Sequence, residues 1–97
     1  MSYKIQITEE AETDILQAKD WYEQQQVGLG QSFVATVKEH INLLKNPAIE
    51  HKVVSQNIRR ILVNRFPFII YYTRDEDKLL VKIIALLHNR RQQLKFE

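Results

Sequence analysis

The spacing of the apolar residues changes once along this 97-residue chain, and that change limits the folds it can adopt. Before residue 46 the apolar side chains recur every three or four residues, which is typical of amphipathic helices. From residue 58 onward they form short runs rich in isoleucine, leucine and tyrosine, which indicate β-strands. A chain of this length buries one small core. We therefore expect a single α+β domain over residues 1–97, with helices packed on a sheet.

A strand and a helix are expected first. Tyr3, Ile5 and Ile7 alternate with polar residues, which indicates a half-buried strand. Thr8 is a good N-cap, and acidic residues follow it where they suit the positive end of a helix dipole. The first helix should run to about Gln25, with an apolar face formed by Ala11, Ile15, Ala18 and Tyr22.

A second helix is expected after the glycines at positions 28 and 30. Its apolar face comprises Phe33, Val37, Ile41 and Leu44, and it should end near Asn46 because the residue before a proline disfavours helical geometry. The two helices would then form an antiparallel hairpin. Residues 47–57 show no period and are expected to form a loop.

Three strands are expected in the remainder of the chain. They lie at residues 61–63, in a β-type region that begins at Ile58, at residues 68–73, and at residues 79–87. A polar turn at residues 75–77 joins the last two strands. The predicted fold is an N-terminal strand, an antiparallel helical hairpin and three antiparallel strands in one mainly antiparallel sheet. The hairpin would cover one sheet face and leave the other partly open.

Charge is divided unevenly along the chain. Residues 1–50 carry four lysines and eight acids, whereas residues 51–97 carry ten lysines and arginines and four acids. This asymmetry favours an acidic partner, either nucleic acid or protein. The absence of cysteine excludes disulfides and thiolate chemistry, and no histidines pair at ligand spacing, so no metal or cofactor is expected. With no signal peptide and no membrane-length apolar run, we expect a cytoplasmic protein.

The basic side chains of the second half form the candidate site. Arg59, Arg60 and Arg65 flank the first predicted strand there, and His88, Arg90 and Arg91 follow the last one. Adjacent antiparallel strands would bring these groups into one neighbourhood, where guanidinium groups suit phosphate. Lys82 joins them if it faces the same side, and either Tyr71 or Tyr72 could offer a ring for stacking. The alternative is that these charges are solvated and protect strand edges.

Several segments together resemble the RelE/ParE superfamily of toxins from type II toxin–antitoxin systems. The matching segments are Ala11-Glu12-Thr13-Asp14-Ile15, Trp21-Tyr22-Glu23, Gly28-Leu29-Gly30-Gln31-Ser32-Phe33, Asn46-Pro47, Ile58-Arg59-Arg60-Ile61, the run from Arg65 to Tyr72, and the run from Ile83 to Arg91. Their order and spacing cover nearly the whole chain.

The resemblance implies a helical hairpin on a mainly antiparallel sheet and an antitoxin that masks the active surface. It also implies one of two targets, because RelE-like toxins cut messenger RNA in the ribosome and ParE-like toxins poison DNA gyrase. In a nuclease, Arg59, Arg60 or Arg91 would stabilise charge on the scissile phosphate and His88 would move a proton. Phe68 stands where RelE has an arginine, and the ending around His88 is closer to ParE.

Three hypotheses follow from these observations. The chain is a metal-independent endoribonuclease, a gyrase inhibitor that does no chemistry, or a basic module that binds nucleic acid or protein without toxicity. In the first two, the partners are a cognate antitoxin and either ribosome-bound mRNA or gyrase.

Overall fold

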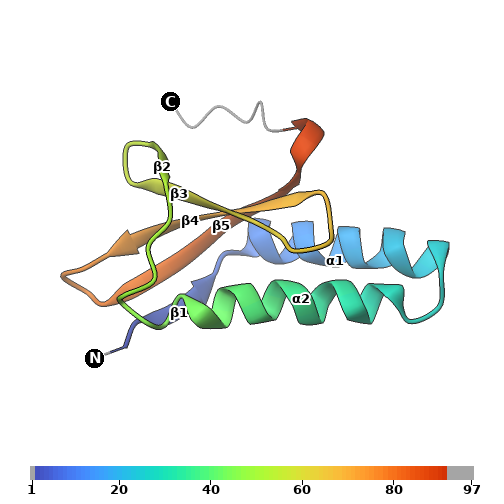
Figure 1. Ribbon diagram of the computed structural model, residues 1–97, viewed down its shortest axis with the longest axis horizontal. Helices are drawn as coiled ribbons and strands as arrows, with labels where there is room; N and C mark the ends of the chain where they lie inside the picture. The colour runs from blue at the N-terminus through green and yellow to red at the C-terminus, as the bar shows by residue number, and fades with distance from the viewer. Residues whose placement is uncertain (1, 92–97) are drawn as a thin grey trace.

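Five strands form one sheet, and two helices cover one of its faces (Figure 1). This computed structural model describes residues 2–91, except for the side chain of Arg91. The elements are β1 (Lys4–Ile7), α1 (Glu9–Gln25), α2 (Leu29–Leu43), β2 (Val53–Ser55), β3 (Ile58–Leu62), β4 (Phe68–Asp75), β5 (Leu80–His88) and a short 3-10 helix, η1 (Asn89–Arg91).

The strand order is β1-β5-β4-β3-β2, so the first strand of the chain pairs with the last. β1 runs parallel to β5, and every other neighbouring pair is antiparallel. The predicted α+β class and mainly antiparallel sheet are therefore confirmed. Within residues 2–91, neither helix has the length and apolar character that crossing a bilayer requires.

Two details of the structure differ from the prediction. Residues 53–55 form a strand, so four strands follow the helices where three were expected. β2 forms because it pairs with β3, where Val53 is in register with Arg59. The sequence does not reveal it, because a three-residue edge strand with exposed valines shows no alternation of apolar and polar residues. The second helix ends at Leu43, before Asn46, because the next three residues form i→i+3 hydrogen bonds in a tighter turn.

Thr8 fixes the start of α1 against the sheet. Its hydroxyl oxygen accepts a hydrogen bond from the Ala11 N–H at 3.1 Å, which confirms the predicted N-cap. The same hydroxyl donates to the Ile83 carbonyl of β5 at 3.0 Å, and the Thr8 N–H donates to that carbonyl at 3.1 Å. The point where β1 ends and α1 begins is therefore tied directly to β5.

The turn between the helices depends on two glycines and one carboxylate. Glu23 accepts hydrogen bonds from the N–H groups of Gly28 and Gly30, each at 2.9 Å, and these bonds lower the pKa of its carboxyl. Gly28 has a φ of +88°, which favours glycine. A Cβ at Gly30 would lie 2.7 Å from the Lys19 carbonyl oxygen. The helices approach this closely because position 30 has no side chain.

The main core lies between the sheet and the hairpin. The predicted helix faces supply Phe33 and Val37 from α2, and the sheet supplies Ile70, Tyr72 and Ile83. A second, smaller cluster lies on the opposite sheet face and contains Ile69, Tyr71 and Ala85. Side chains of β4 alternate between the two faces, so consecutive residues belong to different clusters.

We predict that Gly30→Ala lowers the free energy of unfolding by about 1–3 kcal/mol, because the added methyl group forces the helices apart. Urea unfolding followed by circular dichroism measures this change. Gln31→Ala, at an exposed position one residue further along α2, is the control and should change stability by less than about 0.5 kcal/mol. Equal stability of the two variants would contradict the close contact at Gly30.

Candidate functional site

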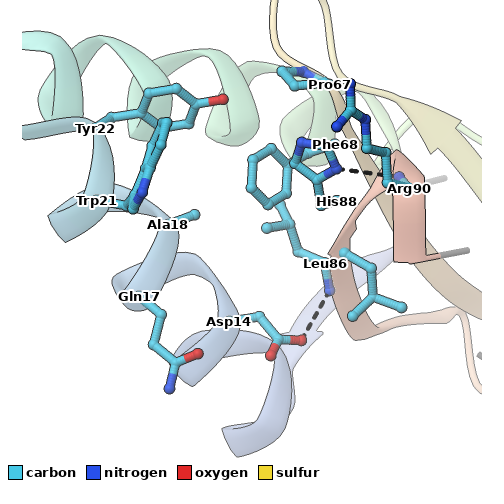
Figure 2. Close-up of a pocket in the computed structure, with 11 residues that line it drawn as sticks. Asp14, Gln17, Ala18, Trp21, Tyr22, Pro67, Phe68, Leu86, His88 and Arg90 are labelled. Atoms are coloured by element: carbon cyan, nitrogen blue, oxygen red, sulfur yellow. Dashed lines mark hydrogen bonds between the residues drawn. The ribbon is translucent and has the colours of Figure 1, made fainter. Parts of the chain in front are cut away.

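A cavity of about 610 Å³ opens between the second half of α1 and the end of β5 (Figure 2). It exists because β1 ends at Ile7, opposite Ile83, whereas β5 continues to His88. Beyond Ile83, α1 lies beside β5 in the layer of the helices. The residues that line the cavity are Asp14, Gln17, Ala18, Trp21, Tyr22, Pro67, Phe68, Leu86, Leu87, His88 and Arg90.

Asp14 closes the lower end of this cavity. Its carboxylate accepts a hydrogen bond from the Leu86 N–H at 3.0 Å, where a neighbouring strand would otherwise offer a carbonyl (Figure 2). Burial raises the pKa of Asp14 above its ordinary value, and nearby Glu10 adds to the effect, whereas the Leu86 N–H opposes it. The ionised carboxylate is thus held here at an electrostatic cost.

Arg90 supplies the cationic side of the cavity, and the His88 ring lies beside it. The His88 ring meets Phe68 edge-on, with ring centroids 5.3 Å apart. Its Nδ1 accepts a hydrogen bond from the Arg90 N–H at 3.1 Å, which leaves Nε2 as the ring nitrogen that carries a proton. Arg90 is exposed, and no described carboxylate forms a salt bridge with it. The predicted Arg91 side chain lies outside the described residues.

Trp21 and Tyr22 have different roles on the α1 side. Tyr22 is 8% exposed and packs with Phe68 and Phe33 in the core, which also raises the pKa of its hydroxyl by burial. Trp21 is 57% exposed and meets the Tyr22 ring edge-on at 5.0 Å. Figure 2 shows both rings along the cavity wall. A solvent-accessible tryptophan beside a cavity is typical of a binding surface.

Arg59, a predicted site residue, lies elsewhere and faces the helix side of the sheet. Its Nη1 donates to the His51 carbonyl at 2.9 Å, and its Nε is buried with no hydrogen-bond partner among the described residues. The Tyr72 hydroxyl and His51 Nδ1 share a hydrogen bond of 2.8 Å. Burial lowers the pKa of His51, helped by His40 and Arg59. This cluster holds the loop before β2 against the sheet.

Arg74 anchors the same loop, and sequence reasoning did not identify it. Its side chain is 8% exposed and donates to the Pro47 carbonyl at 2.8 Å and the Ile49 carbonyl at 3.2 Å. It also donates to the Tyr3 hydroxyl at 2.9 Å and lies 4.6 Å from the centre of that ring. Arg59 and Arg74 therefore both hold residues 47–51 in place through hydrogen bonds to backbone carbonyls.

Arg65 is directed toward α2. It lies in the turn between β3 and β4 with a φ of 71°, and its Nη2 donates to the Thr36 hydroxyl at 3.2 Å. Its guanidinium carbon is 5.8 Å from the centre of the Phe66 ring. Arg65 is not among the residues that line the cavity.

Arg60, Tyr71 and Lys82 lie on the sheet face that the helices leave uncovered. Arg60 is in register with Tyr71 of β4, whereas Lys82 is in register with Thr73. The structure thereby separates the two tyrosines, because Tyr71 belongs to the cluster on this face and Tyr72 to the main core. Both rings are buried, with 3% and 1% exposure.

The expectation that all the basic groups share one neighbourhood was wrong. β4 lies between β3 and β5, so the strands that carry them are not adjacent. Consecutive residues also point to opposite faces, which separates Arg59 from Arg60. Of the predicted site residues with described side chains, the cavity brings together only His88 and Arg90, and residues 2–91 contain no cluster of acids or histidines able to hold a metal ion.

Comparison with models of known protein families identifies the family of this chain. The model that describes the ParE toxin of the type II toxin–antitoxin system parDE matches residues 5–93. The chain belongs to the ParE toxin family. This confirms the resemblance inferred from the segments around Trp21, Arg59 and His88. None of the curated protein sequences matches the chain at a significant level.

Solved structures of distant relatives share the fold of this ParE-family toxin. A chain of the chromosomal ParDE system from P. aeruginosa has a TM-score of 0.73 at 18% identity, over 89% of this chain and 95% of that one. A chain of the RelBE2 toxin–antitoxin complex from Mycobacterium tuberculosis has a TM-score of 0.64 at 18% identity, over 91% of this chain and 92% of that one. A chain of the intact E. coli RelBE complex has a TM-score of 0.56 at 16% identity, over 88% of this chain and 94% of that one.

Sequence reasoning missed the α1 side of the cavity in this family member. Asp14, Gln17, Ala18 and Trp21 follow the i, i+3, i+4, i+7 spacing of one helix face. That face lies next to the predicted core face of the helix and contains both polar and aromatic residues. Such a mixture is typical of helix positions at the edge of a core. The sequence shows this helical spacing, but it does not show that no described strand pairs with residues 84–88 on the side away from β4.

We predict that Asp14→Asn raises the free energy of unfolding at about pH 7, because asparagine keeps the acceptor for Leu86 without the buried charge. A carboxyl whose pKa is higher in the folded state than in the unfolded state stabilises the fold only when it is protonated. This contribution is fully present below the unfolded-state pKa, and it is lost as the pH rises through the folded-state pKa. The advantage of the variant should therefore vanish below the ordinary value of 3.8.

Urea unfolding at about pH 7 and about pH 3 measures the effect of Asp14→Asn. Asp20→Asn, an exposed acid on the same helix, controls for the loss of one negative charge. An Asp14→Asn variant less stable than wild type at neutral pH would contradict this account of the buried carboxylate.

Proposed function

We propose that this toxin inhibits growth by binding DNA gyrase and not by cleaving RNA, and that an acidic antitoxin neutralises it. Gyrase is the target implied by the ParE resemblance. The observation that carries the proposal is the separation of Arg59 and Arg60 from His88, which the nuclease hypothesis would bring to one phosphate.

Phosphodiester cleavage needs a charge-stabilising group and a proton-transfer group within hydrogen-bond reach of the same atoms. Arg59 is in register with Tyr72, whereas His88 is in register with Phe68, four residues away on β4. At the rise of a strand this separates the two backbones by about 13 Å along β4 alone. Arg60 lies on the other sheet face. This arrangement supports binding over catalysis.

The cavity beside β5 has the composition of a protein-binding site. Exposed Trp21 and Arg90 flank an apolar wall that includes Phe68 and Leu86. Tryptophan and arginine at the edge of an apolar cavity are the residue types that contribute most to protein interfaces. We assign target binding to this surface.

The antitoxin part of the proposal has separate support. The solved relatives are toxin–antitoxin complexes, and the second half of this chain has a large excess of positive charge. An acidic antitoxin segment would complement that charge and would bind less tightly as salt increases.

We predict that Trp21→Ala reduces inhibition of gyrase supercoiling by roughly tenfold or more, because truncation removes the largest exposed apolar contact of the cavity. Purified toxin titrated into a supercoiling reaction measures this effect. Leu43→Ala is a matched control, since Leu43 is also 57% exposed but lies outside the cavity. The control should inhibit like the wild type.

Inducible expression separates the three hypotheses. Gyrase poisoning should produce double-strand DNA breaks while transcripts remain intact. Undisturbed supercoiling with excess wild-type toxin, together with cleaved mRNA in a ribosome-containing extract, would replace this proposal with the nuclease hypothesis. Harmless expression in the absence of any partner would favour a non-toxic binding module.

A further inference from the structure

The segment between α2 and β2 is held in place by side chains of other elements. It leads from the end of α2 to β2, the strand at one edge of the sheet (Figure 1). Residues 44–52 contain turns but no helix or strand. Arg59 and Arg74 donate hydrogen bonds to three of its carbonyl groups. The position of the segment therefore depends on a few polar contacts with the sheet.

His51 takes part in these contacts as a hydrogen-bond acceptor. Its Nδ1 lies 2.8 Å from the hydroxyl oxygen of Tyr72 on β4, and the two rings meet edge-on. Burial raises the pKa of the Tyr72 hydroxyl, whereas a bond from the His51 backbone N–H opposes this rise. An oxygen that receives this N–H directs its own proton to Nδ1, so Nδ1 carries the lone pair of a neutral ring.

His40 of α2 is a second acceptor beside the first. Its Nε2 accepts a hydrogen bond from the N–H of Asn64, in the turn between β3 and β4, at 3.0 Å. A protonated imidazole donates from both ring nitrogens and cannot accept this bond. His40 also lies close enough to His51 for its charge to lower the pKa of His51. Two neighbouring contacts of the fold therefore require neutral histidines.

The groups nearest to His51 are mainly basic. Burial lowers the pKa of His51 most, and the charges of His40 on α2 and Arg59 on β3 lower it further. Arg59 forms no salt bridge with any described carboxylate, and its Nε is buried without a hydrogen-bond partner in that part of the chain. Lys52, the next residue along the chain, is also basic. A proton on His51 therefore adds charge to a site that is already positive.

The acids near this cluster do not offset that charge at His51. Glu50 precedes His51 in the chain, and its charge acts on the Tyr72 hydroxyl, but it is not among the groups that shift the pKa of His51. Glu76 is exposed and lies 3.9 Å from Arg74, the basic side chain that β4 contributes. An imidazolium at position 51 consequently has no described carboxylate as an ion-pair partner.

We propose that this cluster is an acid-sensitive switch, which holds residues 47–52 and the turn at Asn64 while its histidines are neutral and releases them when the histidines bind protons. Protonation of His40 removes the acceptor of the Asn64 N–H. Protonation of His51 places an N–H opposite the Tyr72 hydroxyl proton and adds repulsion within the cluster. The switch concerns the free chain, so it goes beyond the proposed function and does not depend on it.

The sign of the pH dependence follows from the lowered pKa of His51. A histidine whose pKa is lower in the folded state than in the unfolded state stabilises the fold when it is neutral. This contribution is fully present above the ordinary value of 6.5, and it is lost as the pH falls from 6.5 through the folded-state pKa. Asp14 acts in the opposite direction, because its pKa is raised. A comparison of variants that all keep Asp14 isolates the histidines.

We predict that lowering the pH from about 7.5 to about 5.5 increases the unfolding constant at least about threefold more in the wild type than in a His40→Gln/His51→Gln variant. Glutamine keeps an acceptor at each position but does not titrate. Urea unfolding followed by circular dichroism measures the constants. His88→Gln is the matched control and should keep the wild-type pH dependence, because His88 lines the cavity. Equal pH dependence of the wild type and the double variant would overturn the inference.

Amide hydrogen exchange of the wild-type chain tests the switch without a substitution, and it decides if the double variant does not fold. The protection factor of the Asn64 N–H should fall at least about tenfold over the same pH interval, because its acceptor is His40. The Val63 N–H, bonded to the Phe68 carbonyl at 2.9 Å, is the internal control and should keep its protection. Unchanged protection at Asn64, or an equal loss at both amides, would count against the switch.

Discussion

Parallel pairing of β1 with β5 is the interaction on which the rest of the structure depends. It joins the first and last strands of the sheet in sequence, and Thr8 secures it by bonding to Ile83 from both its backbone and its side chain. Because the same threonine caps α1, the sheet edge and the helix start are set at one residue. β1 stops there while β5 continues, and this difference in length creates the cavity of about 610 Å³.

The basic residues illustrate how strand geometry distributes chemistry. Neighbours in sequence, such as Arg59 and Arg60, occupy opposite sheet faces and serve different purposes. Arg59 and Arg74 hold the carbonyl groups of residues 47–51, Arg65 bonds to α2, and Arg90 remains at the cavity. Three arginines of the positive second half, Arg59, Arg65 and Arg74, thus anchor neighbouring segments, whereas Arg90 lines the cavity.

The elements with a strong period were predictable from the sequence, and those defined by pairing were not. Tyr22, Phe33 and Val37 recur at helical spacing and are buried as expected, because one helix face must meet the core whatever the topology. β2 escaped prediction because its hydrogen bonds come from β3 and its exposed valines carry no alternation. For the site, His88 and Arg90 were anticipated, whereas Asp14 and Trp21 were not.

By itself the sequence determined the class of fold, the helix boundaries near Thr8 and Gly28, and the family, since these depend on local spacing and on the order of short segments. Only the tertiary structure decided which basic groups meet, which of Tyr71 and Tyr72 enters the core, and where a sheet edge is left open. The physical reason is that strand order, register and the early end of β1 are set by contacts between residues up to 76 positions apart, such as Lys4 and Leu80, which no local pattern records.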